Sequence, residues 1–417
     1  MLSHVATARD KGLEVGRWAV LMCLFSVPIN KPATNISIVL ALVCAVLGGR
    51  ALERFRNAIR QPVVIGALLW FLALFFSALI VSPGAEGLAA LGPYKALLYP
   101  LIVAMLLDTR QWRDRALFSF GLSVTLILLT SWAQFLIAIP GGDFARTTTV
   151  DSFTVFKNYT QQGLAFLVLA ALAACFANVE QDGKRKRILW FVAGAAFINV
   201  IYLLQSRTAY LIAAPLLLYW GWRLLSRQRS RWRGAVIALL LLAVVGTAAM
   251  LTPRFQQRIV QAKEDVSLYS TQNAPTSMGV RLELWKRTLP MIASAPLFGH
   301  GLGQWKEEFL KQVKEPGYNP GFLMGHPHQE ALQILAEQGV VGFALFVLAL
   351  VMLAMTIRRL EPPYRDFYSC LLLIYVTAGL ANCILADFSH RHIFLMLLAC
   401  IPVAPAMARA RALGVPA

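Results

Sequence analysis

Two histidines and a glutamate lie close together in the segment GHPHQEALQILAEQGVVGF, residues 325–343. His326 and His328 come directly before a long apolar stretch, where titratable side chains are unusual. Pro327 fits the first turn of a helix, so the sequence predicts His326 at or near the N-cap and His328 in the first turn. A helix N-terminus attracts anions and disfavours a protonated imidazole. A neutral histidine placed there is suited to accept a proton near pH 7.

Two arginines in other segments could act with these histidines on an anionic substrate. Arg207, in LLQSRTAYL, stands where one apolar stretch ends and the next begins. Arg281, in GVRLELW, lies on a segment with the spacing of an amphipathic helix. A guanidinium donates two parallel hydrogen bonds to phosphate oxygens, which suits a pyrophosphate group. An arginine at a membrane surface also contacts lipid headgroups, and the sequence leaves both interpretations open.

Metal ligation is the other chemical role open to His326 and His328. No companion cluster of acidic residues or cysteines stands at ligand spacing near them, so no metal site and no cofactor are predicted. The six cysteines all fall inside or at the edge of apolar stretches, and none forms a CxxC pair. They are interpreted as small apolar side chains.

The composition places these residues in a membrane protein. Of 417 residues, 58% are hydrophobic and 14% are charged, whereas a soluble chain carries about 25% charged residues. Several apolar runs have the length of roughly 17–25 residues that a membrane-spanning helix needs. The sequence predicts an all-α polytopic membrane protein with about 12 transmembrane helices, at 16–30, 33–48, 62–81, 91–107, 116–139, 160–178, 188–205, 208–225, 234–251, 339–357, 367–386 and 393–408.

Lysine and arginine are distributed unevenly between the connections. Alternate connections, starting with the N-terminus, carry 24 of the 39 Lys and Arg residues, the opposite short connections carry six, and residues 252–330 carry nine. The positive-inside rule then predicts cytoplasmic termini in a bacterial inner membrane, with 252–330 and the histidines on the periplasmic face. The net charge of +18 is interpreted as a topological and lipid-binding feature, so nucleic-acid binding is not expected.

Residues 252–330 are too long and too polar for a plain connector. Three helices are predicted within them: one in RFQQRIVQAKEDV, one in SMGVRLELWKRTLPMIAS, and one after the glycine-rich turn of APLFGHGLGQWKEEFLKQV. The second has Leu282, Trp285, Leu289 and Ile292 at helical spacing on one face. The expected organisation is therefore transmembrane helices one to nine in 1–251, a helical periplasmic cap carrying part of the active site in 252–330, and helices ten to twelve in 331–417.

The motifs QSRTAYL, RLELW…PLFGHGLGQW and HPHQEALQILAEQGVVGF, in this order on such a chain, resemble the O-antigen ligase family. The wider superfamily also contains O-antigen polymerases and protein oligosaccharyltransferases. The resemblance covers topology over most of the chain, with motif-level matches between about residues 200 and 345. The segment RTTTVDSFTVFKNYTQQG, residues 146–163, also resembles an external loop of the family.

The resemblance implies a metal-independent glycosyltransferase. It would move a glycan from undecaprenyl pyrophosphate to a hydroxyl of the lipid A–core oligosaccharide on the periplasmic face, with inversion at the anomeric carbon. His328 is implied as the general base, with His326 as its neighbour or alternate. Arg207 and Arg281 are implied as ligands of the pyrophosphate. The expected partners are the lipid-linked donor, the lipid A–core acceptor and membrane lipids.

Three other activities are alternatives. An O-antigen polymerase uses the same donor, but the long loop between spans nine and ten followed by an HxH helix favours a ligase. Protein oligosaccharyltransferases often carry an additional C-terminal external domain, whereas this chain is expected to end soon after its last span. A transporter would show charged or broken segments inside its spans, whereas the cationic residues here lie at the ends of predicted spans.

Overall fold

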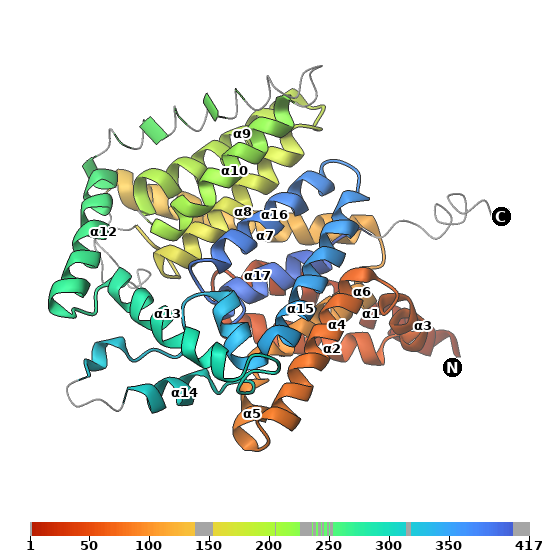
Figure 1. The fold of residues 1–417 in the computed structure, drawn as a ribbon. Coiled ribbons are helices and arrows are strands. Elements are labelled where there is room, and N and C mark those ends of the chain that lie inside the picture. The colour runs from red at the N-terminus through yellow and green to blue at the C-terminus, as the bar shows by residue number, and fades with distance from the viewer. Residues whose placement is uncertain are drawn as a thin grey trace.

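The computed structural model describes residues 2–137, 153–204, 206–225, 253–313 and 318–402, with single positions between 236 and 250. Every regular element in these ranges is a helix (Figure 1). The elements up to residue 137 are α1 (Leu2–Ser26), α2 (Lys31–Leu47), α3 (Ala51–Ala58), α4 (Pro62–Phe76), the π-helix η1 (Ser77–Val81), α5 (Ala85–Ala90), the 3₁₀-helix η2 (Pro93–Leu98), α6 (Tyr99–Leu106) and α7 (Arg110–Ile137). The later elements are α8 (Tyr159–Ala177), α9 (Gly183–Ile198), the π-helix η3 (Asn199–Leu204), α10 (Arg207–Leu225), α12 (Pro253–Gln272), α13 (Ser277–Ser294), α14 (Trp305–Gln312), the 3₁₀-helix η4 (Pro320–Phe322), α15 (Glu330–Arg358), α16 (Tyr364–Gly379) and α17 (Phe388–Ala399).

The helices include several that fit an integral membrane protein. Among the described residues, five are long and apolar enough to cross a bilayer, and a sixth is added if α2 and α3, which are bent by 114° at their break, form one span. The predicted all-helical membrane architecture is therefore confirmed, while the number of twelve spans stays a prediction. The predicted span 234–251 lies almost entirely outside the described residues.

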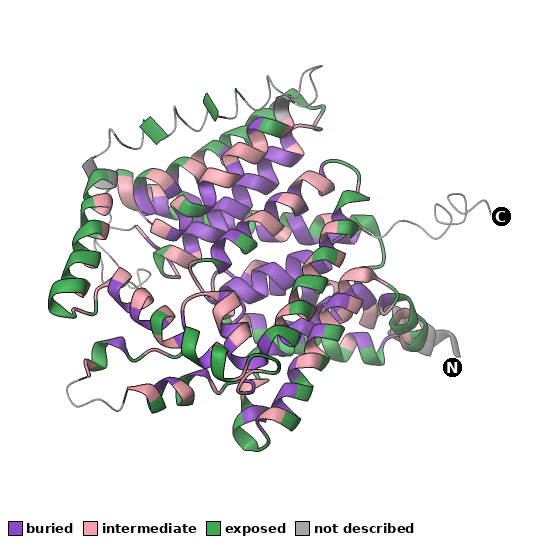
Figure 2. Cartoon of the chain, in the orientation of Figure 1, coloured by how far each residue is buried: buried purple, intermediate pink, exposed green. Residues whose placement is uncertain are grey.

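Helix α8 is the central helix of the bundle. Its sequence is rich in alanine, and 83% of its most apolar stretch is buried inside the protein. Such small side chains let neighbouring backbones approach closely. Helices α8, α9 and α10 run side by side, and α8 also contacts α7 and α16 (Figure 1). Figure 2 shows that α8, α16 and α17 are largely buried, whereas α12 is largely exposed.

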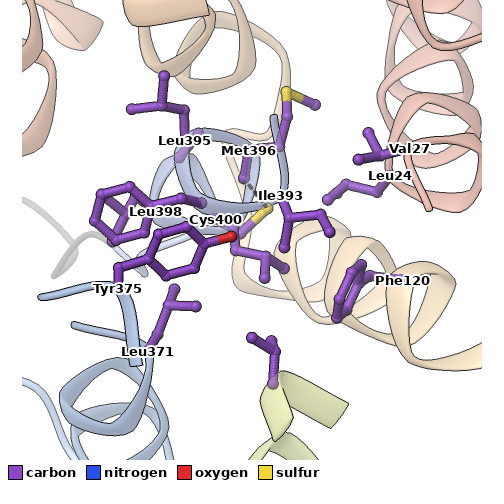
Figure 3. Close-up of a cluster of buried hydrophobic side chains, with 14 of the residues drawn as sticks. Leu24, Val27, Phe120, Leu371, Tyr375, Ile393, Leu395, Met396, Leu398 and Cys400 are labelled. Carbon is purple, nitrogen blue, oxygen red and sulfur yellow. Dashed lines mark hydrogen bonds between the residues drawn. The ribbon is translucent and has the colours of Figure 1, made fainter. Parts of the chain in front are cut away.

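Helix α17 anchors the middle of the core. Figure 3 shows Ile393, Leu395, Met396 and Leu398 of this helix among apolar side chains of α1, α7 and α16. All four side chains are buried. Because α17 is fixed on several sides, the turn that precedes it at 380–387 is held at a defined place in the bundle.

The structure corrects the predicted form of the helix that follows the histidines. Helix α15 begins at Glu330, not at Pro327, and Gln329 is its N-cap residue. It is also not continuous, because Gly339 has φ 62 and ψ −166, outside the helical region. The first part therefore ends near residue 338, and the two parts of α15 do not form one continuous helix.

A glycine-rich loop stabilises this break. The amides of Val340 and Val341 donate to the carbonyls of Pro296 and Leu297, at 2.8 and 3.1 Å. In return, the amides of His300 and Gly301 donate to the carbonyls of Ala336 and Glu337, both at 2.9 Å. Backbone groups that a helix break would leave unpaired are thus satisfied by segment 296–301.

The three helices predicted in 252–330 are present as α12, α13 and α14. The apolar face that was predicted for the second helix, α13, is not buried throughout, because Leu289 is 58% exposed. The buried positions of α13 include Val280, Leu284 and Met291, which pack in one cluster with Trp305 of α14. The position of this helical cap relative to a membrane stays a prediction.

Residues predicted on the cytoplasmic and periplasmic faces lie at opposite ends of helices α10 and α16. Helices α10 and α16 pack against each other. At one end Arg223 pairs with Asp366, near the start of α16. At the other end Thr208, in the first turn of α10, accepts a hydrogen bond from Asn382, just beyond α16. The two helices are therefore antiparallel, with their basic ends together and Arg207 at the end that carries the histidines.

Candidate active site

The two histidines lie in a turn before α15, not in its first turn. The backbone of His328 has φ 54, in the left-handed region that only a few per cent of residues other than glycine adopt. Such a conformation costs about 1–3 kcal/mol and persists only where the surroundings hold it. The Trp285 indole of α13 does so, since its Nε1 donates to the carbonyl of Pro327 at 3.0 Å. The Gln329 side chain holds the other side by capping α15 through the amide of Leu332.

The two imidazoles are close together but differ in their bonding. Their ring centroids lie 4.3 Å apart in an edge-to-face arrangement. The backbone amide of His328 donates to Nδ1 of His326 at 3.3 Å, which favours the tautomer of His326 protonated on Nε2. Since Nδ1 of His326 is already an acceptor in the turn, His326 shapes the turn and His328 carries the freer imidazole.

Asn382 links His328 to the start of α10. Its side chain lies beside the imidazole of His328 and raises the pKa of that imidazole, against the larger effect of burial. Its Nδ2 also donates to Oγ1 of Thr208 at 3.3 Å. Thr208 directly follows Arg207, so the amide of Asn382 bridges the histidine turn and the arginine-bearing end of α10.

The guanidinium groups of Arg207 and Arg281 differ in how many of their hydrogen-bond donors have a partner. Arg207 Nη1 forms a 2.7 Å ion pair with Asp265 of α12. Arg281 of α13 donates from Nη1 to the carbonyl and hydroxyl of Ser277, at 2.8 and 3.0 Å. Its Nε is buried and has no hydrogen-bond partner among the described residues. Arg281 therefore holds a spare, buried donor, which an oxyanion could accept from.

Electrostatic interactions show that the predicted residues converge. Burial lowers the pKa of His328 to about 4, and the charges of His326 and Arg281 act in the same direction. Burial also lowers the pKa of Arg281, and the nearby charge of Arg207 adds to this effect. An arginine still stays protonated at neutral pH. The site at rest thus contains two cations beside an uncharged His328, an arrangement suited to an anionic ligand.

The buried Glu330 stabilises the turn between α16 and α17, which lies next to the histidine turn. Its Oε2 accepts the backbone amide of Leu385 at 3.1 Å, from the turn between α16 and α17. Arg391 of α17 donates to the carbonyls of Leu385 and Ala386 in the same turn. Glu330 and Arg391 therefore fix the turn that presents Asn382 to His328.

Asp387 completes this side of the cluster. It is the N-cap residue of α17 and accepts a hydrogen bond from Nε2 of Gln161 at 2.6 Å. Its charge reaches His326, whose pKa is lowered by burial and raised in part by Asp387. An acidic side chain thus lies near His326, whereas Arg281 lies near His328.

Sequence reasoning missed Asp265, Asn382 and Asp387, and it noted Glu330 without giving it a role. Asn382 falls inside the predicted span 367–386, because the apolar run LLLIYVTAGLANCILA hides the end of α16 at Gly379. A polar Asn followed by an Asp near the end of a predicted span was the available signal. Within the described ranges, no three His, Cys, Asp or Glu side chains are grouped as a metal site.

Sequence comparison identifies the part of the chain that carries this cluster. Residues 191–347 match the family described as O-antigen ligase. This segment is therefore similar to O-antigen ligase domains. It contains both arginines and both histidines, whereas Asn382 lies beyond it.

Three bacterial proteins are similar to parts of this chain. A protein of Haemophilus influenzae with no named function is 34% identical over 118 residues, which cover 27% of this chain and 30% of that protein. A general O-oligosaccharyltransferase of Acinetobacter baylyi is 27% identical over 215 residues, 50% of this chain and 36% of the relative. A Rickettsia conorii protein provisionally named a polysaccharide ligase is 22% identical over 256 residues, 60% of this chain and 58% of the relative.

The chain therefore spans about a third of the length of the first two relatives and over half of the third. Two of the three names describe the attachment of a glycan to another molecule. Together with the match to the O-antigen ligase family, they support a membrane enzyme of the glycosyl-transfer type.

Proposed function

We propose that this protein transfers an O-antigen glycan from undecaprenyl pyrophosphate to a hydroxyl of the lipid A–core oligosaccharide. The observation that carries the proposal is the convergence of Arg207, Arg281 and His328 at one end of the helix bundle. Two cations and a neutral imidazole match a reaction in which an anionic leaving group departs and a hydroxyl loses a proton. The match of residues 191–347 to the O-antigen ligase family supports the same class of reaction.

The arginines bind the pyrophosphate in this proposal. Arg281 offers its unpartnered Nε, and Arg207 is oriented by Asp265 without losing its charge. As the glycosidic bond breaks, its electron pair passes to the pyrophosphate oxygen, where negative charge increases. Cations already positioned at that oxygen stabilise the transition state more than the ground state.

His328 accepts the proton of the attacking hydroxyl. The acceptor oxygen bonds to the anomeric carbon while the bond to pyrophosphate breaks on the opposite face, so the product has inverted configuration. The bound pyrophosphate offsets the charge of Arg281, which raises the pKa of His328 from its low resting value. The base is therefore strengthened when the donor is in place.

The proposal puts this chemistry on the periplasmic face of the inner membrane, with both termini in the cytoplasm. It is supported by the segregation of lysine and arginine between alternate connections. It is also supported by the antiparallel pairing of α10 and α16, which separates Arg223 from Arg207. Tags inserted at residue 184 and near residue 270 should report cytoplasm and periplasm, respectively.

Two other acceptors are alternatives to the lipid A–core oligosaccharide. The similarity to a general O-oligosaccharyltransferase favours a protein hydroxyl as the second candidate acceptor. An O-antigen polymerase would instead use a second lipid-linked glycan. All three reactions use the same donor chemistry, so the site geometry serves each of them.

A deletion strain separates these acceptors. Loss of long chains from lipopolysaccharide, with accumulation of lipid-linked polymer, is the expected result for a ligase. Core carrying a single repeat would identify a polymerase, and loss of glycan from proteins alone would identify an oligosaccharyltransferase. Unchanged lipopolysaccharide and unchanged glycoproteins would contradict the proposed function.

A further inference from the structure

Helix α3 has an apolar face and a polar face, and both are exposed. It comprises the eight residues Ala51–Ala58, most of which lie on the surface (Figure 2). Leu52 and Phe55, three residues apart, lie on one face and are 62% and 39% exposed. Glu53 and Asn57, four residues apart, are exposed on the other face. Two large apolar side chains are therefore left uncovered on a helix that already turns a polar face to water.

The direction of α3 sets it apart from the preceding helix α2. Helix α2 has 17 residues and is thus about 26 Å long, close to the roughly 30 Å of hydrocarbon in a bilayer. The chain then bends by 114° between α2 and α3. When α2 crosses the bilayer, α3 consequently runs nearly parallel to the membrane surface and does not continue the span.

Local contacts fix this bend. Arg50, the N-cap residue of α3, has φ 56, in the left-handed region. Nη2 of Arg54 donates to the carbonyl of Ala45 at 2.8 Å, which pairs an acceptor in the last turn of α2. On its inner side α3 packs against α6, and Ala58 is fully buried (Figure 1). The apolar face of α3 is therefore held in a defined direction.

This face continues the exposed apolar surface of α2. Val43, Val46 and Leu47, in the last turns of α2, are 45%, 58% and 72% exposed. In a helix that crosses a membrane, such side chains contact lipid. The exposed Leu52 follows Leu47 after the bend, so the lipid-facing surface extends onto α3.

Arginines surround the apolar face of α3. Arg50, Arg56 and Arg60 are all exposed, and Glu53 is the one acidic residue between positions 49 and 61. Arg50 and Glu53 approach only to 3.9 Å and are largely exposed, so this pair is weak. The segment thus keeps a positive charge beside its exposed apolar side chains.

We propose that α3 is an interfacial helix that binds anionic phospholipids of the cytoplasmic leaflet. Leu52 and Phe55 enter the acyl-chain boundary, while Arg50, Arg56 and Arg60 reach the phosphate groups. Basic amphipathic helices with aliphatic and aromatic side chains on the apolar face bind membranes in this way. The cytoplasmic leaflet carries a negative surface potential, which attracts the arginines. The inference does not depend on the proposed transfer reaction, which takes place on the opposite face of the membrane.

Spin labels on the two faces of α3 test this placement. Leu52→Cys and Asn57→Cys are each labelled with a nitroxide, in protein reconstituted into nanodiscs that contain phosphatidylglycerol. The collision rate of each label with oxygen, which concentrates in lipid, is compared with its collision rate with a water-soluble nickel chelate. None of the six native cysteines is exposed, so wild-type protein treated in the same way gives the background.

The label at residue 52 should favour oxygen, and the label at residue 57 should favour nickel. A preference for oxygen at both positions would show that α3 lies inside the hydrocarbon as part of a broken span. A preference for nickel at both would show that α3 stands away from the membrane. Little contact with either reagent at residue 52 would show that protein covers this face. Each of these three results would overturn the proposal.

A photoreactive phosphatidylglycerol tests the choice of lipid. Added to wild-type protein in phosphatidylcholine nanodiscs, it should label the peptide 50–60. Ordinary phosphatidylglycerol should compete with this labelling, and the same amount of extra phosphatidylcholine should not. Equal competition by both lipids would show that α3 takes any bilayer lipid, and the assignment to anionic phospholipid would be wrong.

A single arginine gives the matched variant for this measurement. Arg56→Gln should lower the labelling roughly fivefold, because one arginine near an anionic surface contributes about 1 kcal/mol. Arg185→Gln, at the exposed start of α9, is the control and should be labelled like the wild type. Equal labelling of α3 in the two variants would contradict the role of the arginines in binding the headgroups.

Discussion

The side chain of Asn382 lies beside the imidazole of His328, and its Nδ2 donates to the hydroxyl of Thr208 at 3.3 Å. Three segments far apart in the sequence therefore meet at one amide: the histidine turn, the turn before α17 and the start of α10. This amide orients the imidazole without adding charge. Its dipole raises the pKa of His328 in part, against the lowering by burial and by the charges of His326 and Arg281.

Replacing this amide with a carboxylate should move the pH dependence of transfer. In the free enzyme, His328 has a pKa of about 4 and must be neutral to accept a proton. We therefore expect kcat/KM of the wild type to be flat above about pH 5 and to fall below it. Asn382→Asp puts an anion beside the imidazole, which raises its pKa by about 1–3 units. The acidic limb of kcat/KM should shift upward by the same amount. An active Asn382→Asp variant with an unshifted limb would show that His328 is not the titrating base.

Transfer should depend on the planar shape of the Arg207 and Arg281 guanidinium groups as well as on their charge. Arg281→Lys and Arg207→Lys keep the positive charge but lose the planar fork that binds two phosphate oxygens. We expect each variant to lose transfer by about tenfold or more, since hydrogen bonds to charged groups contribute about 1.5–3 kcal/mol. Isothermal titration with undecaprenyl pyrophosphate should show weaker binding. Arg185→Lys, at the exposed start of α9, is the matched control and should behave as wild type. Wild-type donor binding by both site variants would return these arginines to the role of lipid-headgroup ligands.

Gly339 should be intolerant of any side chain. It has φ 62, and an added Cβ would lie 2.3 Å from the backbone carbonyl of Leu297. Gly339→Ala should lower the free energy of unfolding by about 2–4 kcal/mol, from left-handed strain and from displacement of the loop that pairs with the break. Gly194→Ala in α9 is the control, because its Cβ would meet no atom within 4 Å. Thermal unfolding of the purified proteins in detergent measures both. Equal melting temperatures for the two variants would mean that the break at Gly339 is not the native conformation.

Transfer should also survive metal removal. The described residues offer no group of three His, Cys, Asp or Glu ligands, and the charge on the leaving group is met by arginines instead. Activity of the purified enzyme in excess EDTA should equal its activity without chelator. Loss of activity that one divalent ion restores would instead make His326 and His328 candidate ligands.

The sequence predicted the elements of the site better than their connections. The helices α12, α13 and α14 follow from local apolar spacing and turn residues, and all three are present. The break in α15 depends on pairing with segment 296–301, some forty residues away, and local spacing carries no sign of that partner. For the same reason, Pro327 suggested a helix start, whereas contact with Trp285 of α13 holds it in a turn.

Some side chains of the site were predicted from the sequence, and others were not. Arg207 and His328 were found because cationic or titratable residues at the ends of apolar runs are conspicuous. Arg281 was found because it lies on a segment with the spacing of an amphipathic helix. Asp265 and Asn382 act through tertiary contacts, one with Arg207 and one with His328. Their chemical types are common on protein surfaces, so only the folded arrangement distinguishes them.

The central claim is that His328 accepts the proton of the attacking hydroxyl, and His328→Asn tests it with the least disturbance. Asparagine adopts positive φ readily, so it retains the left-handed turn at φ 54, whereas alanine would add strain. General-base catalysis is typically worth about 10²–10⁴-fold.

The decisive measurement is single-turnover transfer by purified His328→Asn, with donor binding measured on the same preparation. We predict that the transfer rate falls by about 10²–10⁴-fold while the Kd for the lipid pyrophosphate changes little, because the arginines hold the donor. A transfer rate close to that of the wild type, or a donor affinity that is lost together with the rate, would contradict the assignment of His328 as the base.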